Sequence, residues 1–172
     1  MGAPDYSLYK AEDYPIKEIE SLRIAIIHTE WNPQIVGLLT SSCKEELLSH
    51  GLQPDNLLIH KVPGSYELPM GTKLVLGSQE RADAIICLGC VIQGETKHDD
   101  YINHTIARSL NQLGLVSGIP VIFGVLTTNT LDQALARADG SHGSKGKESA
   151  IAALKMISLK ESLGQKSKKI SF

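Results

Sequence analysis

Three clusters in this sequence contain residue types that bind ligands or move protons. Trp31 has a large apolar ring, which stacks on a flat ligand if it is exposed and anchors a core if it is buried. Glu67 carries a carboxylate that accepts hydrogen bonds from hydroxyl groups or stabilises the first turn of a helix. His98 is of the residue type suited to proton transfer near neutral pH. Residue type alone leaves a structural role open as the alternative for each of these side chains.

Each of these clusters directly follows a predicted strand, which is the arrangement that would bring them together. Ligands of open parallel sheets bind beyond the carboxyl ends of the strands. Short apolar runs typical of buried strands occupy residues 22–28, 57–62, 84–90 and 121–126. Periodic or helix-like segments follow at residues 35–47, 68–76, 102–115, 131–138 and 148–159.

The alternation of strands and helices predicts an α/β fold, a three-layer sandwich with a four-stranded parallel sheet. A parallel connection needs a dozen or more residues, and a helix supplies them. We expect residues 1–20 to form an arm ordered only by contact, residues 21–160 to form the domain, and residues 161–172 to form a frayed basic tail.

Composition excludes several classes of function. The chain has 172 residues, of which 42% are hydrophobic, and this suits one compact domain. A formal net charge of -2 gives no basic field for nucleic acid. Its apolar runs are shorter than the ~20 residues of a membrane span. Three cysteines and the lack of an apolar leader favour a soluble protein of the reducing cytoplasm.

Two local motifs suggest other functions, and both are poor matches. The stretch GCVIQGET at residues 89–96 has the spacing of a phosphate-binding P-loop, but Glu95 stands where that motif needs lysine. Cys87 and Cys90 form a C-x-x-C pair inside a predicted strand, where residues three apart face opposite sides. A zinc or redox site would also lack a second pair of ligands.

Five motifs in this order resemble the lumazine synthase family, and the resemblance covers residues 23–156. VPGSYELP and GETKH are far more specific than any single glycine motif. The motifs are HTEWN (28–32), VPGSYELP (62–69), LGCVIQGETKH (88–98), PVIFGVLT (120–127) and QALARADGSHGSKG (133–146).

The resemblance implies a flavodoxin-like fold and an enzyme of riboflavin biosynthesis. Such an enzyme joins a ribitylaminouracil to dihydroxybutanone phosphate, releasing phosphate and water. The implied sites for the pyrimidine and its ribityl chain are Trp31, Ser65, Tyr66, Glu67, Cys90, Val91, Ile92 and Phe123. The implied phosphate site comprises Gly94, Glu95, Thr96, Arg137 and Lys145.

The resemblance also assigns general acid–base catalysis to His98. The substrate's own amine can form the imine, so Lys97 is given no covalent role, and neither a cofactor nor a metal is expected. Catalysis would rest mainly on holding two reactants in attack geometry. A flavin-binding or shell-forming relative without turnover is the alternative, and the intact site residues argue against it.

In the family the active site lies between subunits of a pentamer, so the resemblance implies that Phe123 and Arg137 act on a neighbour's pocket. Some members pack twelve pentamers into an icosahedral shell and can associate with riboflavin synthase. Residues 137–146 contain no insertion, which favours the shell, although Asp139 and Ser144 depart from the usual bend. Residues 1–20 would then add a strand to a neighbour's sheet.

Overall fold

The computed structural model of the chain describes Ile16, residues 18–95 and residues 98–167. Its centre is a four-stranded parallel sheet in the order β2-β1-β3-β4. The strands are β1 (Ile24–Thr29), β2 (Leu57–Val62), β3 (Ala84–Ile92) and β4 (Val121–Thr128). The predicted parallel sheet is therefore confirmed, with β3 and β4 each two residues longer than the sequence pattern indicated.

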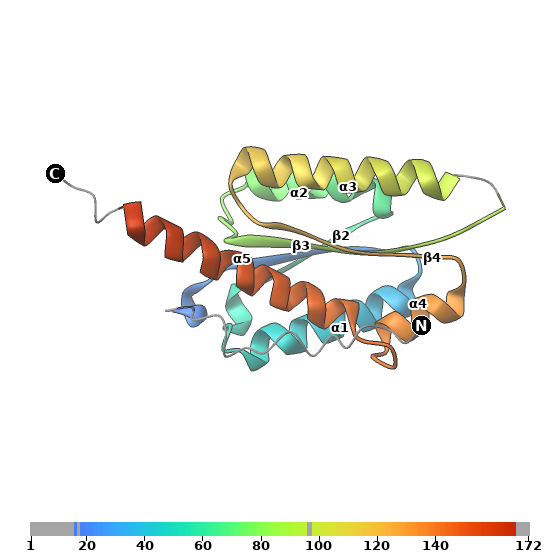
Figure 1. The fold of residues 1–172 in the computed structure, drawn as a ribbon, viewed down its shortest axis with the longest axis horizontal. Coiled ribbons are helices and arrows are strands. Elements are labelled where there is room, and N and C mark those ends of the chain that lie inside the picture. Colours follow the sequence, from blue (N-terminus) through green and yellow to red (C-terminus); the bar gives the residue numbers. More distant parts are fainter. Residues whose placement is uncertain (1–15, 17, 96–97, 168–172) are drawn as a thin grey trace.

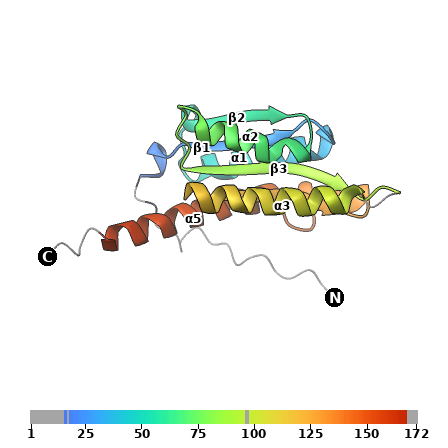
Figure 2. The ribbon, with the colours of Figure 1, turned by 90° about the horizontal axis from the view of Figure 1, so that it is seen from above.

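Helices cover both faces of the sheet (Figure 1). One face carries α2 (Leu68–Gly77) and α3 (His98–Ser117), and the other carries α1 (Pro33–Ser49), α4 (Leu131–Ala138) and α5 (Lys145–Ser167). Figure 2 shows the long α3 lying along β3, and Figure 1 shows α5 on the opposite side of the sheet. This is the three-layer α/β sandwich expected from the sequence.

The core has two parts because strand side chains alternate between faces. Ile24, Ile26 and Leu88 pack with α1, α4 and α5, whereas Ala25 and Ile27 pack with α2 and α3. All five side chains are fully buried. Burial on both faces explains why these strands are nearly continuous apolar runs in the sequence.

Glycine allows α5 to pack closely on its neighbours. A Cβ atom at Gly146 would collide with the Ser42 hydroxyl and the Leu39 carbonyl of α1. A Cβ at Gly124 of β4 would lie 2.7 Å from the Ser149 Oγ atom of α5. The glycine-rich stretch thus allows the last helix to fit against both the sheet and α1.

Regular structure continues a few residues beyond both expected bounds of the domain. The 3-10 helix η3 (Ile19–Ser21) crosses the expected boundary at residue 20, and Ile16 and Ile19 pack against the core. Helix α5 continues to Ser167, past the expected end at residue 160. No helix in the described ranges is both long and apolar enough to cross a membrane.

Candidate active site

A pocket of about 500 Å³ lies beyond the carboxyl ends of β1, β2 and β3, where the sequence predicted a site. Three connections and the start of α3 form its walls, so the pocket depends on the whole sheet rather than on one local motif. Its lining consists of Trp31, Asn32, Gly64, Ser65, Tyr66, Glu67, Cys90, Val91, Ile92, Gly94 and Ile102.

Trp31 belongs to the turn between β1 and α1 and has 72% of its surface exposed. That exposure rules out the alternative in which Trp31 anchors the core. An indole ring with so much free surface offers an apolar face to a flat ligand.

Gly64 lets the Trp31 ring and the Glu67 carboxylate approach the same point. A Cβ atom at Gly64 would lie 3.4 Å from Trp31 Cδ1 and 3.0 Å from Glu67 Oε2. Glu67 is the last residue of the 3-10 helix η5 (Ser65–Glu67) and does not cap a helix through its side chain. Glu67 is the N-cap residue of α2, so the alternative in which its carboxylate stabilises the first turn of α2 through the helix dipole stands beside ligand binding. The carboxylate also stands beside the aromatic ring, in reach of a ligand that has both a flat ring and hydroxyl groups.

Ser65 and Tyr66 occupy different depths of the pocket. Ser65 is buried at 8% exposure, and its Oγ atom would lie 2.9 Å from a Cβ at Gly89 of β3. Tyr66 is exposed at 60% and forms an outer wall. The close approach at Gly89 shows why β3 needs glycine where Ser65 packs against it.

Sequence reasoning placed Asn32 and Gly64 in the motifs but not in the site, and it missed Ile102. The Asn32 Nδ2 atom donates to the Cys90 carbonyl at 3.0 Å, and the backbone of Asn32 is left-handed with φ 55°. The sequence signal for Asn32 was its place between an aromatic residue and Pro33, the first residue of a helix. Asparagine tolerates this conformation better than most residues.

The segment between β3 and α3 carries the expected phosphate-binding residues. Gly94 lines the pocket and Glu95 is exposed. Thr96 lies outside the described residues, as does the side chain of His98, whose backbone begins α3. The catalytic candidate is therefore the first residue of α3, the helix whose Ile102 lines the pocket.

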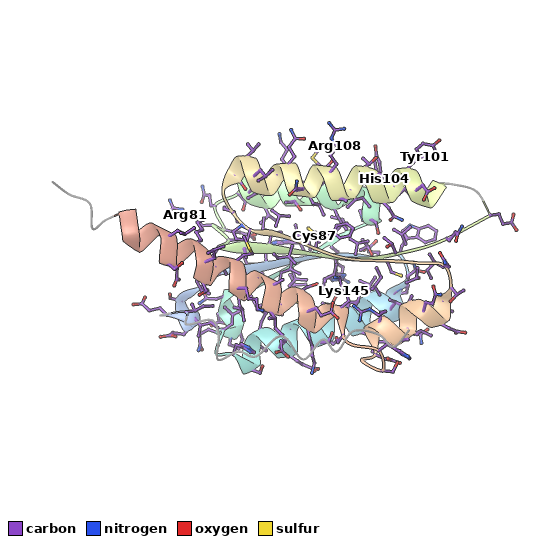
Figure 3. All side chains as sticks on the ribbon, in the orientation of Figure 1. Arg81, Cys87, Tyr101, His104, Arg108 and Lys145 are labelled. Atoms are coloured by element: carbon purple, nitrogen blue, oxygen red, sulfur yellow. The ribbon has the colours of Figure 1, made fainter. Side chains whose placement is uncertain are left out.

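Arg137 and Lys145 form a separate cluster between α4 and α5. The Arg137 Nη2 atom lies 2.8 and 3.0 Å from the two carboxylate oxygens of Glu148, and its Nη1 atom donates to the His142 carbonyl at 2.6 Å. Lys145 Nζ is 3.7 Å from Glu148 Oε2. Figure 3 shows Lys145 on the α5 side of the sheet, opposite α3 with Tyr101 and His104.

The single chain therefore does not bring all expected site residues together. Phe123 lies on β4, half-buried against the core on the α2–α3 face, and is not part of the pocket lining. Arg137 and Lys145 are likewise absent from that lining. Glu148 was not identified from the sequence, although a carboxylate three residues after Lys145 was the available signal.

Burial makes the thiols poor nucleophiles. It raises the pKa of Cys43 and Cys87 to about 12 and that of Cys90 to about 11. Cys87 and Cys90 belong to opposite core clusters, as their spacing predicted, and both are free thiols. Among the described residues, no three His, Cys, Asp or Glu side chains are grouped as metal ligands.

Comparison with known proteins identifies relatives along nearly the whole chain. The family model of 6,7-dimethyl-8-ribityllumazine synthase matches residues 21–161. The enzyme of that name from Cytophaga hutchinsonii is 44% identical over 159 residues, covering 91% of this chain and 98% of its own. The enzyme from Porphyromonas gingivalis is 42% identical over 154 residues, covering 88% and 95%. The enzyme from Bacteroides fragilis is 42% identical over 144 residues, covering 84% and 100%.

Proposed function

This chain belongs to the 6,7-dimethyl-8-ribityllumazine synthase family, and on that premise we propose how its residues divide the reaction. The enzyme is a transferase of riboflavin biosynthesis. It condenses 5-amino-6-(D-ribitylamino)uracil with 3,4-dihydroxy-2-butanone 4-phosphate to 6,7-dimethyl-8-ribityllumazine, releasing phosphate and water.

The uracil substrate binds in the pocket with its ring against Trp31 and its ribityl chain toward Glu67. One observation carries this proposal. The exposed Trp31 indole and the Glu67 carboxylate lie next to each other, and Gly64 leaves room for both. Ser65 and the backbone of Cys90, Val91 and Ile92 complete the inner wall, and Tyr66 closes the outer side. A flat ring and a chain of hydroxyls match this combination of apolar surface and acceptor.

The phosphate of the second substrate binds where β3 leads into α3. Backbone N–H groups at the start of a helix attract phosphate, and Gly94 to Thr96 occupy that position in the chain. Arg137 provides a planar fork suited to bidentate contact, with Lys145 as a second cation. Glu95 adds a negative charge at this point, so the two cations must outweigh it.

His98 moves protons during phosphate loss, imine formation and ring closure. Its place at the first residue of α3, between Gly94 and Ile102 of the pocket lining in the sequence, supports this role. The amine of the uracil substrate supplies the nucleophile, so no covalent bond to the protein is required. The remaining acceleration comes from holding the two reactants close together.

Phe123 and Arg137 complete the pocket of a neighbouring subunit in a pentamer. Support comes from their position outside the pocket of their own chain and from apolar surface left uncovered near β4. Leu115 and Val116 at the end of α3 are 77% and 82% exposed. Leu115 also lines a hollow of about 450 Å³ that reaches Met156 and Leu159 of α5. A second copy of the chain would cover this surface.

Twelve pentamers would form an icosahedral shell in the cytoplasm. The short link between α4 and α5, which runs from Asp139 to Ser144 without an insertion, supports the shell. Riboflavin synthase would be its natural guest, because that enzyme consumes the product. Light scattering after size exclusion tests the assembly: a mass of sixty chains is expected, whereas a mass of five chains would refute the shell and an active monomer would refute the shared site.

Two measurements on the purified chain test the site itself. Mixing it with both substrates should produce lumazine fluorescence. Trp31 is the sole tryptophan, so adding the uracil substrate alone should quench the intrinsic fluorescence. Product formation without any change in Trp31 emission on binding would overturn the proposed stacking.

A further inference from the structure

The exposed ring of Trp31 needs something other than packing to hold its orientation. With 72% of its surface free, the side chain has few neighbours to restrain it, so its direction depends on the backbone of its turn. Two hydrogen bonds fix part of that turn. The Glu30 N–H donates to the Val62 carbonyl at 3.0 Å, and the Thr29 hydroxyl donates to the Trp31 carbonyl at 3.3 Å. The first bond ties the turn to β2, and the second lies within the turn itself.

On the side of the turn that faces β3, a hydrogen bond from Asn32 restrains the backbone. Pairing between β1 and β3 ends at His28 and Leu88, so two residues later the Cys90 carbonyl has no partner from the β1 ladder. The Asn32 Nδ2 atom takes that place and donates to it at 3.0 Å. The side-chain amide thus extends the connection between the two strands beyond the point where backbone pairing stops.

The backbone of Asn32 sets the direction in which the turn leaves β1. Its φ of 55° and ψ of 54° are left-handed, and only Arg81 shares a positive φ among the described non-glycine residues. The carbonyl of Asn32 then accepts from the Val36 N–H at 3.0 Å as α1 begins. Asparagine serves both needs, because it tolerates the left-handed region and its amide carries a donor.

We propose that Asn32 is a positioning residue that fixes the Trp31 ring over the pocket by bonding the Cys90 carbonyl, and so determines affinity for the pyrimidine substrate. This inference rests on the proposed stacking of the pyrimidine on Trp31. Asn32 lines the same pocket, so the hydrogen bond from its side-chain amide links the wall that carries Trp31 directly to the wall formed by β3.

Three substitutions at Asn32 distinguish the contribution of its backbone conformation from that of its side-chain amide. Asn32→Gly keeps easy access to the left-handed conformation and removes the amide. Asn32→Asp keeps the size but replaces the donor with an oxygen that repels the Cys90 carbonyl. Asn32→Ala removes the amide and also strains the backbone. Asn56→Asp is the matched control, because the Asn56 amide donates to the Glu20 carbonyl at 2.8 Å, before β2 and away from the pocket.

The first readout is the mobility of Trp31 without substrate, measured by time-resolved fluorescence anisotropy and acrylamide quenching. We expect faster ring motion and stronger quenching in Asn32→Gly and Asn32→Asp, and values like those of the parent in Asn56→Asp. Unchanged mobility in Asn32→Gly would overturn the positioning role, whatever happens to activity.

The second readout is steady-state kinetics with the full enzyme. The KM for the uracil substrate should rise roughly three- to tenfold in Asn32→Gly, as for one lost hydrogen bond, while kcat changes less than about twofold. In a Trp31→Ala background the same substitution should add almost nothing to that KM. A full additional effect there would show that Asn32 acts without Trp31 and would refute the proposal. A mobile ring with an unchanged KM would leave the Asn32–Trp31 link standing, but it would refute the effect of Asn32 on pyrimidine affinity and with it the proposed stacking.

Discussion

The pocket around Trp31 and the cation cluster around Arg137 are built in opposite ways. In the pocket, backbone and amide hydrogen bonds fix the turns, and the Trp31 ring and Glu67 carboxylate face open space. In the cluster, Glu148 already pairs with Arg137 at 2.8 Å, with side-chain exposures of 15% and 24%. A half-buried charge is costly without a partner, whereas an aromatic ring and a carboxylate at an open pocket remain solvated.

This difference indicates which substrate must rearrange the protein. The uracil compound would meet a preformed surface, which keeps the entropic cost of binding low. The phosphate must share Arg137 with Glu148 or displace it. Substitutions in the two regions should therefore affect the two substrates separately, and the following experiments test that separation from the largest expected effect to the smallest.

Arg137→Ala should cause the largest loss, confined to the phosphate substrate. We expect kcat/KM for the butanone phosphate to fall about 100- to 1,000-fold, since the proposed bidentate contact with phosphate is lost. Glu148 also loses its Arg137 partner. The KM for the uracil substrate should change less than about threefold. Steady-state kinetics with each substrate varied in turn will measure both, with the exposed Arg108→Ala on α3 as control. Equal losses for both substrates would abolish the distinction between the two regions.

His98→Ala should come next and should slow turnover without weakening uracil binding. We expect kcat to fall about 10- to 100-fold, because positioning of the reactants remains. Rates are followed by absorbance and the fold by circular dichroism. His104→Ala, farther along α3, should behave like the parent. Unimpaired turnover in His98→Ala would remove this histidine from the mechanism.

Gly64→Ala should weaken uracil binding moderately. The added methyl would lie 3.0 Å from Glu67 Oε2 and 3.4 Å from Trp31 Cδ1, so one of the two side chains must shift. We expect the KM for the uracil substrate to rise several-fold, roughly the effect of one or two lost hydrogen bonds, with the KM for the phosphate substrate unchanged. Gly37→Ala in α1 is the control, because a Cβ there meets no atom within 4 Å. Similar effects of both substitutions on the KM would contradict the account of Gly64.

The smallest expected effect is a dependence of the free energy of unfolding on pH, caused by the buried cysteine thiols. Burial raises the pKa of Cys87 from 9.0 to about 12, so the folded chain holds this proton more tightly than the unfolded chain. Its contribution to stability is complete below pH 9 and is lost as the pH rises from 9 toward 12. Urea unfolding at pH 8 and pH 10 will show the decrease. Rapid labelling of native Cys43, Cys87 or Cys90 by a thiol reagent at pH 8 would contradict it.

The sequence determined the fold because its apolar pattern admits one arrangement. Runs such as residues 57–62 and helices such as residues 131–138 coincide with β2 and α4, since strand and helix periods are local properties of the chain. The sheet then placed Trp31, Ser65 and Glu67 at one edge, as a parallel topology requires. The family resemblance added the roles that residue types alone left open, such as the choice between core and ligand for Trp31.

Tertiary structure alone decided which hydrogen bonds fix the pocket and which of the expected site residues lie outside it. The bond from Asn32 to Cys90 joins residues 58 positions apart, and no periodic pattern encodes it. The pairing of Arg137 with Glu148 depends on how α4 meets α5. These features arise from contacts between distant segments, which become defined only when the packed layers bring those segments together.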